Sequence, residues 1–230
     1  MKKIILLLSV LILLTSCGWN WEWKNTENNY SENNEAKNDN SDEYVIDDSN
    51  FETWKELLKN IEVSELTEKE INGLILMREE EKLANDVYET LYKKWNEKIF
   101  NNITKSEKVH TAAVWDLLIR YNIEDPIKDH TVWLFTSEKL QKLYNDLVDK
   151  GSVSLIEALK VWMMIEDLDI YDLEELSLTT DKKDILLVYS NLIDGSVKHM
   201  QAFYKNLNRK WGSYKNQFIS DERYEEIIWG

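Results

Sequence analysis

The sequence predicts an all-α protein, a four-helix bundle with a long crossover between its second and third helices. Glycine and proline are scarce, with six and one among 230 residues, which favours long helices over a turn-rich β fold. Apolar residues recur at three- and four-residue spacing in four long segments, as expected of helices with one buried face. Short connections join the segments in two pairs, but residues 122–152 separate the pairs. A connection of that length can bring the third helix parallel to the second.

The first long helix is expected from Thr67 to about Trp95, after a short amphipathic segment at residues 51–61. Thr67 and Glu70 have the spacing of a capping box, in which each side chain accepts a hydrogen bond from the other residue's backbone N–H. At about 1.5 Å per residue this helix is roughly 40 Å long, enough to form one wall of a bundle.

The second helix is expected to begin at Thr104, because Thr104 and Glu107 repeat the capping-box spacing, and to end near Tyr121. The crossover that follows carries an extra short helix, expected at about residues 137–149 and closed by Gly151.

The third long helix is expected from about Val153 to Leu176 and the fourth from about Asp181 to Asn208. The third helix has apolar residues on two faces and should therefore be largely buried. Together these elements make residues 51–230 a single helical domain.

Residues 1–17 have the pattern of a secretory signal peptide, with two lysines, an apolar run interrupted only by Ser9, and small residues before the chain's single cysteine. The run is shorter than the roughly 20 residues that a membrane-spanning helix needs. The stretch "LTSC" resembles a bacterial lipobox, which makes Cys17 the lipidated first residue of the mature protein. The alternative is an ordinary signal peptide with an incidental cysteine. We expect an extracytoplasmic protein, anchored through the lipid on Cys17 to the cell membrane or the outer membrane.

Residues 18–50 are rich in Asn, Glu, Ser and Asp, and they should form an acidic, disordered tether because they bury too little apolar surface to offset ordering. The net charge of −15 and the lack of a basic patch argue against nucleic acid as a partner. With Cys17 lipidated, no thiol remains for a disulfide or a soft metal site. Any chemistry must therefore come from carboxylates, imidazoles and hydroxyls.

Ionisable residues lie on the apolar stripe of each long helix, where a core is expected. These residues are Glu80 in the first helix, Glu107 and His110 in the second, Glu166 and Asp169 in the third, and His199 in the fourth. A lone buried carboxylate is costly or takes up a proton, so the group needs cationic partners. A bound metal would supply positive charge to all four helices at once, and carboxylates with imidazoles suit iron, manganese or zinc.

Each of these residues, taken singly, also has a structural interpretation. Glu107 can be half of its capping box, and His110 or His199 can be a core histidine bonded to a backbone carbonyl. However, two of the three histidines fall on internal stripes of helices expected to be neighbours. Three other residues are interpreted as solvent-facing: Glu79, Glu81 and His130.

Glu-x-x-His on a bundle helix, with carboxylates on the others, resembles the ferritin-like carboxylate-bridged dimetal proteins. Five blocks are also similar, in order and spacing, to an uncharacterised bacterial and archaeal domain-of-unknown-function family of the ferritin-like superfamily. The blocks are "MREEEKLANDVYETLYKKW", "ITKSEKVHTAAVWDLLIRY", "LFTSEKLQKLYNDLV", "GSVSLIEALKVWMMIEDLDIYDLEEL" and "GSVKHMQAF". The similarity covers about residues 66–227 and implies a ferritin-like fold, which does not by itself fix an activity.

The resemblance implies metal ligation by Glu80, Glu107, His110, Glu166 and His199, with Asp169 as a further ligand. The fourth helix departs from the pattern, because Ser196 stands where Glu-x-x-His would place a bridging carboxylate. Asp169, one turn after Glu166, can restore the missing charge, as in the rubrerythrin-like branch, which draws two carboxylates from its third helix.

Three functional hypotheses follow. The first is a lipid-anchored ferritin-like protein that binds one or two iron or manganese ions and acts as a diiron-type oxidase or peroxidase with an unknown electron donor. The second is a metal-free helical surface interaction module, in which the buried polar groups pair with one another. The third is a metal carrier without turnover. A homodimer is the oligomeric state that we consider for this protein.

Overall fold

The computed structural model describes residues 56–230, and every regular element in this range is a helix. After a helical turn at residues 56–59 come α3 (Glu68–Trp95), α4 (Lys98–Arg120), α5 (Glu138–Gly151), α6 (Leu155–Ser177), α7 (Lys183–Arg209) and α8 (Asp221–Trp229). The all-α class is therefore confirmed. None of these helices is both long and apolar enough to cross a membrane. The signal-peptide pattern, Cys17 and the tether lie outside the described residues.

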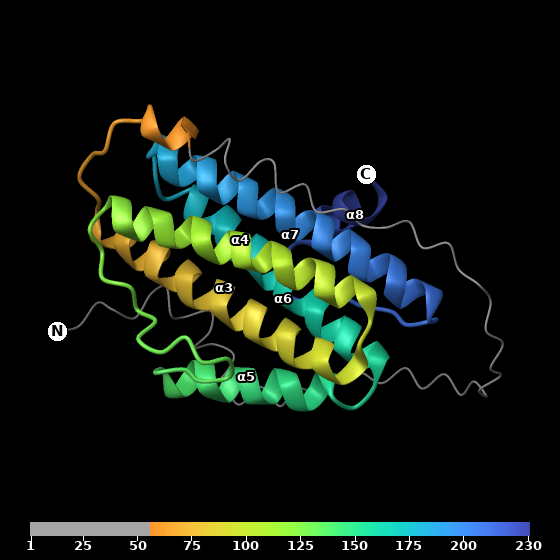
Figure 1. The fold of residues 1–230 in the computed structure, drawn as a ribbon. Helices are drawn as coiled ribbons and strands as arrows, with labels where there is room; N and C mark the ends of the chain where they lie inside the picture. Colours follow the sequence, from red (N-terminus) through yellow and green to blue (C-terminus); the bar gives the residue numbers. More distant parts are fainter. Residues whose placement is uncertain (1–55) are drawn as a thin grey trace. The chain divides into compact units, whose positions relative to one another are not determined.

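The four long helices, α3, α4, α6 and α7, pack against one another in pairs. Helix α3 packs against α4 and α6, and α7 packs against the same two helices. Figure 1 shows that α3 and α4 run antiparallel, that α6 and α7 do the same, and that α4 and α6 run in the same direction. The connection between α4 and α6 therefore crosses from one end of the helices to the other, as its length predicts, and its helix α5 packs against α3 and α6.

The capping box expected at the start of α3 is confirmed. The backbone N–H of Thr67 donates to Glu70 Oε2 at 2.7 Å, and the Glu70 N–H donates to Thr67 Oγ1 at 3.3 Å. Glu70 also accepts a hydrogen bond of 2.6 Å from the hydroxyl of Thr180, which lies just before α7. The helix start is thus bonded to the connection between α6 and α7.

The prediction of a capping box at the start of the second helix is wrong. Helix α4 begins at Lys98, and Thr104 lies inside it, where the threonine hydroxyl donates to the carbonyl of Phe100 at 2.8 Å. Residues in a helix interior already have intrahelical partners for their N–H groups. Glu107 therefore has no capping role.

Gly151 is the last residue of α5, not a residue beyond its end, and Ser152 forms the C-cap. A Cβ atom at Gly151 would lie 2.5 Å from Leu91 Cδ1. The glycine is therefore needed for the close approach of α5 to α3 more than for ending the helix.

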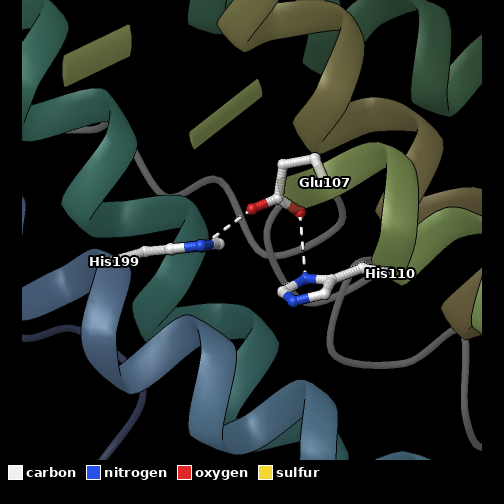
Figure 2. Close-up of side chains that lie close together, drawn as sticks. All are labelled: Glu107, His110 and His199. Carbon is white, nitrogen blue, oxygen red and sulfur yellow. Dashed lines mark ion pairs between the residues drawn. The ribbon is translucent and has the colours of Figure 1, made fainter. Parts of the chain in front are cut away.

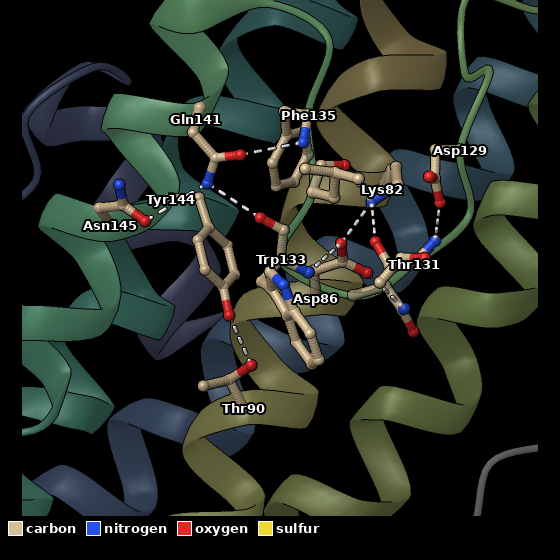
Figure 3. A network of polar contacts seen from close by, with 12 residues as sticks. Lys82, Asp86, Thr90, Asp129, Thr131, Trp133, Phe135, Gln141, Tyr144 and Asn145 are labelled. Carbon is tan, nitrogen blue, oxygen red and sulfur yellow. Dashed lines mark hydrogen bonds and ion pairs between the residues drawn. The ribbon is translucent and has the colours of Figure 1, made fainter.

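The crossover is attached to α3 through Lys82 and Asp86, which lie one turn apart on α3 and form a buried ion pair with each other (Figure 3). Lys82 Nζ also donates to the carbonyls of Thr131 and Leu134, and Asp86 accepts the backbone N–H of Trp133. Trp133 has a φ of 72°, which is unfavourable for a bulky side chain. These bonds hold the strained turn, and with it the chain leading into α5, against α3.

Helix α8 is an element that the periodicity of the sequence does not predict, because nine residues make little more than two turns. It packs against α7, and the loop before it is held by the buried Asp167 of α6. This carboxylate accepts hydrogen bonds from the Tyr214 hydroxyl at 2.6 Å and from the Ile219 N–H at 2.9 Å.

Candidate metal centre

A cluster of ionisable side chains lies between the four long helices, next to an aromatic part of the core. The cluster comprises Glu80 and Glu81 of α3, Glu107 and His110 of α4, Glu166 and Asp169 of α6, and His199 of α7. All except Asp169, which is partly exposed, are no more than 7% exposed. The structure thus brings every predicted ligand residue to one region of the core. His130, interpreted as a surface residue, is exposed.

Glu107 lies between the two histidines (Figure 2). Its Oε1 is 2.8 Å from Nδ1 of His199, and its Oε2 is 3.3 Å from Nδ1 of His110. The two imidazole rings lie with their centroids 5.3 Å apart. One ligand atom from each of the three residues lies within 4.8 Å of the other two, which is close enough for all three to reach one cation.

The helix geometry explains this arrangement. Glu107 and His110 are three residues apart on α4 and therefore share a face, and that face meets α7, which carries His199. Gly195 of α7 provides the space for the His110 ring, because a Cβ atom there would lie 2.4 Å from His110 Nε2. The position of His110 thus depends on a residue without a side chain.

Helix α6 contributes two carboxylates, each held by a hydroxyl group. Glu166 accepts a hydrogen bond of 2.6 Å from the buried phenol of Tyr88, and its Oε1 lies 3.4 Å from Nδ1 of His199. Asp169 accepts a hydrogen bond of 2.5 Å from Ser196. Ser196, which the sequence places at the missing carboxylate position, therefore lies against the carboxylate expected to replace it.

The interpretation of Glu81 as a solvated charge is wrong. Glu81 is 2% exposed, and its Oε2 lies 3.8 Å from Nδ1 of His110. The sequence contains a signal for this, because Glu81 follows Met77 by four residues and precedes Ala84 by three, on one helical face. Glu79 is only partly buried. Glu81 is thus the functional candidate that sequence reasoning missed.

Burial and mutual repulsion govern the charge of the cluster. Burial raises the pKa of Glu81, and the nearby charges of Asp169 and Glu107 raise it further. The pKa of Asp169 is raised for the same two reasons, with Glu166 as its main charged neighbour. Holding several such carboxyls ionised therefore requires added positive charge.

At His199, burial and the neighbouring charges act on the pKa in opposite directions. Burial alone would lower the pKa of His199, but the carboxylates of Glu166 and Glu107 outweigh it and raise that pKa to about 10. Burial would likewise raise the pKa of Glu107, but His110 and His199 hold it well below its usual range. In the metal-free protein the centre of the cluster is therefore a carboxylate between imidazoles, at least one of them protonated.

The donor set and its unsatisfied atoms fit a metal ion. Oε1 of Glu81 and both carboxyl oxygens of Glu80 are buried and accept no hydrogen bond from an N–H or hydroxyl group of residues 56–230. Buried carboxylate oxygens without a donor are costly. A cation would compensate them, and a mixed set of carboxylate oxygens and imidazole nitrogens suits iron, manganese or zinc.

Comparison with known proteins places the chain in a family. Residues 70–230 match the family described as "Uncharacterized protein domain (DUF2202)". The chain is 50% identical over 173 residues to uncharacterized protein MJ0754 of Methanocaldococcus jannaschii, covering 75% of this chain and 94% of that protein. The crystal structure of hypothetical protein MJ0754 from Methanococcus jannaschii is similar with a TM-score of 0.73 and 50% identity, covering 74% of this chain and 98% of that one. The expected membership in a family of unknown function is thus confirmed: the chain belongs to the DUF2202 family of uncharacterized protein domains.

Proposed function

We propose that this protein is a ferritin-like four-helix bundle that binds one or two transition-metal ions, iron or manganese, between its long helices. The observation that carries the proposal is the position of Glu107 between Nδ1 of His110 and Nδ1 of His199, inside a buried group of carboxylates. A cation at this point would convert several unfavourable buried charges into metal–ligand contacts.

The roles of the residues follow from their positions. Glu107 would bridge or chelate, because its two oxygens face different histidines, and His110 and His199 would be terminal ligands through Nδ1. Glu81 would supply the carboxylate from α3, because its Oε2 lies 3.8 Å from Nδ1 of His110. Tyr88 would orient Glu166 by donating its hydroxyl proton to the carboxylate in a hydrogen bond.

The metal-free interaction module is a weaker explanation of the same residues. It requires the buried polar groups to satisfy one another, as buried polar groups generally do. Glu107 is paired with the histidines, but Oε1 of Glu81 and both oxygens of Glu80 accept no hydrogen bond from an N–H or hydroxyl group of the described residues and have other carboxyl groups as their strongest charged neighbours. These unsatisfied oxygens favour a bound cation.

Redox turnover is the finer part of the proposal. Bound iron would supply oxygen or peroxide chemistry, which makes a diiron-type oxidase or peroxidase the candidate enzyme and a carrier without turnover its alternative. This chain contributes the buried ligands, their exclusion from bulk water and the Tyr88 hydroxyl at Glu166. Peroxide consumption by the iron-loaded protein, with an added electron donor, separates the enzyme from the carrier.

Metal binding is tested by chelation, reconstitution with Fe(II) or Mn(II), and metal analysis by plasma mass spectrometry. Glu107→Ala and His110→Ala should each abolish most metal binding and leave helix content nearly unchanged. His130→Ala is the matched control, because this histidine is exposed. Added metal should raise the melting temperature of the wild type and the control but not of the two site variants, since a ligand of the native state stabilises it. Equal shifts in all four proteins would contradict the site.

We also propose that Cys17 carries the lipid that anchors the protein outside the cytoplasm. Support comes from the signal-peptide pattern and the stretch "LTSC". Cys17→Ser should leave an unprocessed precursor in the native host, and globomycin should have the same effect on the wild type. A mature form without acyl mass that is insensitive to globomycin would contradict the anchor.

A further inference from the structure

A second group of carboxyls lies beside the histidine cluster, between α3 and α6. Glu80 of α3 and Asp172 of α6 are both 7% exposed, and their carboxyl groups are hydrogen-bonding neighbours. Neither oxygen of Glu80 accepts a bond from an N–H or hydroxyl group in the described part of the chain. The hydrogen-bonding neighbour of this buried carboxyl is therefore another acid.

Such a pair is unfavourable unless a proton or a cation lies between its members. The strongest charged neighbours of Glu80 are Asp172, Asp169 and Glu79, all of them acidic. Carboxylate oxygens from two neighbouring helices are the ligands that hard divalent cations prefer. Glu80 and Asp172 supply such oxygens from α3 and α6, two helices that pack against each other.

The pair also connects the protein surface with the histidine cluster. Helix α6 carries acidic residues at three-residue intervals, from the buried Glu166 through Asp169 and Asp172 to the exposed Glu175. Each acts electrostatically on the next, Glu166 on Asp169 and Glu175 on Asp172. Carboxylates therefore follow one another along α6 from an exposed position to the core.

We propose that Glu80 and Asp172 form a second, carboxylate-only cation position that takes up a hard divalent cation such as Mn²⁺ or Fe²⁺ and passes it to the Glu107, His110 and His199 group. The inference rests on the proposed metal binding at that group. It adds a separate ion position without nitrogen ligands and a direction of uptake, from Glu175 inward.

The test is a titration of the metal-free full chain with Mn²⁺. The electron paramagnetic resonance signal of free Mn²⁺ measures how much of the ion remains unbound at each step. The double variant Glu80→Gln/Asp172→Asn should bind one Mn²⁺ fewer per chain than the wild type. Pulsed measurements should still detect nitrogen coupling from the histidines in this variant. Its loading should be slower by about tenfold or more, since charged clefts raise cation on-rates by about 10- to 1,000-fold.

Two further variants keep the test decisive. Glu138→Gln/Asp146→Asn removes two exposed carboxylates from α5 with the same change in charge, and it should keep the wild-type ion count and loading rate. Glu175→Gln, at an exposed position, cannot disturb the core and should slow loading without changing the count.

The two proposals fail in different ways. A Glu80→Gln/Asp172→Asn protein that retains the wild-type ion count overturns the second position, and wild-type loading in Glu175→Gln overturns the direction of uptake. A wild type that binds Mn²⁺ without nitrogen coupling contradicts the histidine site instead. If the double variant nevertheless binds one ion fewer than that wild type, the carboxylate position exists without the histidine site.

Discussion

The hydroxyl of Ser196 donates a hydrogen bond of 2.5 Å to Oδ2 of Asp169. The bond joins α7 to α6 at the edge of the cluster, one turn before His199 on α7 and one turn after Glu166 on α6. A serine at this position cannot ligate as a bridging carboxylate would, but it orients the carboxylate that lies opposite. This contact favours the version of the site in which Asp169 provides the missing negative charge.

Asp169→Asn should therefore reduce metal binding more than Ser196→Ala does. The asparagine removes a charged ligand, whereas the alanine removes one hydrogen bond worth about 1 kcal/mol. Adding Ser196→Glu to Asp169→Asn should restore binding, because it returns a carboxylate three residues before His199. Anaerobic Fe(II) titration measures the number of ions bound, with Ser190→Ala, an exposed serine of α7, as the control. An unchanged ion count in every variant would show that neither residue belongs to the site.

Gly195→Ala should weaken metal binding without removing any ligand. The new methyl group would overlap His110 Nε2, so the imidazole must leave its position beside Glu107. Gly151→Ala is the matched control, since its methyl group would meet Leu91 Cδ1 at 2.5 Å, away from the cluster. Both variants should lose thermal stability, but only Gly195→Ala should lose the metal-induced rise in melting temperature. Loss of that rise in both variants would mean that helix packing, not the position of His110, controls binding.

The metal-free protein should become less stable as pH rises from 6 to 8. The raised pKa values of Glu81, Asp169 and His199 mean that the folded chain binds more protons than the unfolded chain in this range. The free energy of unfolding then falls with increasing pH. Above pH 8 the effect is opposed by Lys150, whose pKa burial lowers to about 8.

Melting temperature in the presence of a chelator measures this dependence. A fall of at least about 5 °C is expected, since 1 kcal/mol corresponds to roughly 2–4 °C in a chain of this size. Added Mn²⁺ should reverse the trend, because metal displaces protons from its ligands and binds more tightly at higher pH. A melting temperature in chelator that rises between pH 6 and 8 would contradict the proposed charge state of the cluster.

Asp86→Ala should destabilise the protein far more than Asp146→Ala. Lys82–Asp86 and Lys142–Asp146 are both Lys-Asp pairs at i,i+4, but the first is buried and the second exposed. Breaking a buried pair costs roughly 3–5 kcal/mol, whereas an exposed pair contributes about 0–1 kcal/mol. Urea unfolding of the metal-free variants gives both values, and similar losses would show that the buried pair does not hold the crossover.

Local sequence determined the helices and part of the site. The periodicity of apolar residues located four long helices, and the Thr67–Glu70 capping box marked the first residue of α3. The spacing of Glu107 and His110 required them to share a helical face. These features depend on contacts within a few residues, which the sequence displays directly.

Only the tertiary structure decided how the helices face one another. Because α3 packs against both α4 and α6, two adjacent glutamates point inward, with Glu81 toward His110 and Glu80 toward Asp172. The spacing of residues in a helix gives the angle between two side chains around the helix axis. It does not show which neighbouring helix each side chain faces. The start of α4 at Lys98 and the bond from Ser196 to Asp169 likewise depend on packing between distant segments, which no local pattern records.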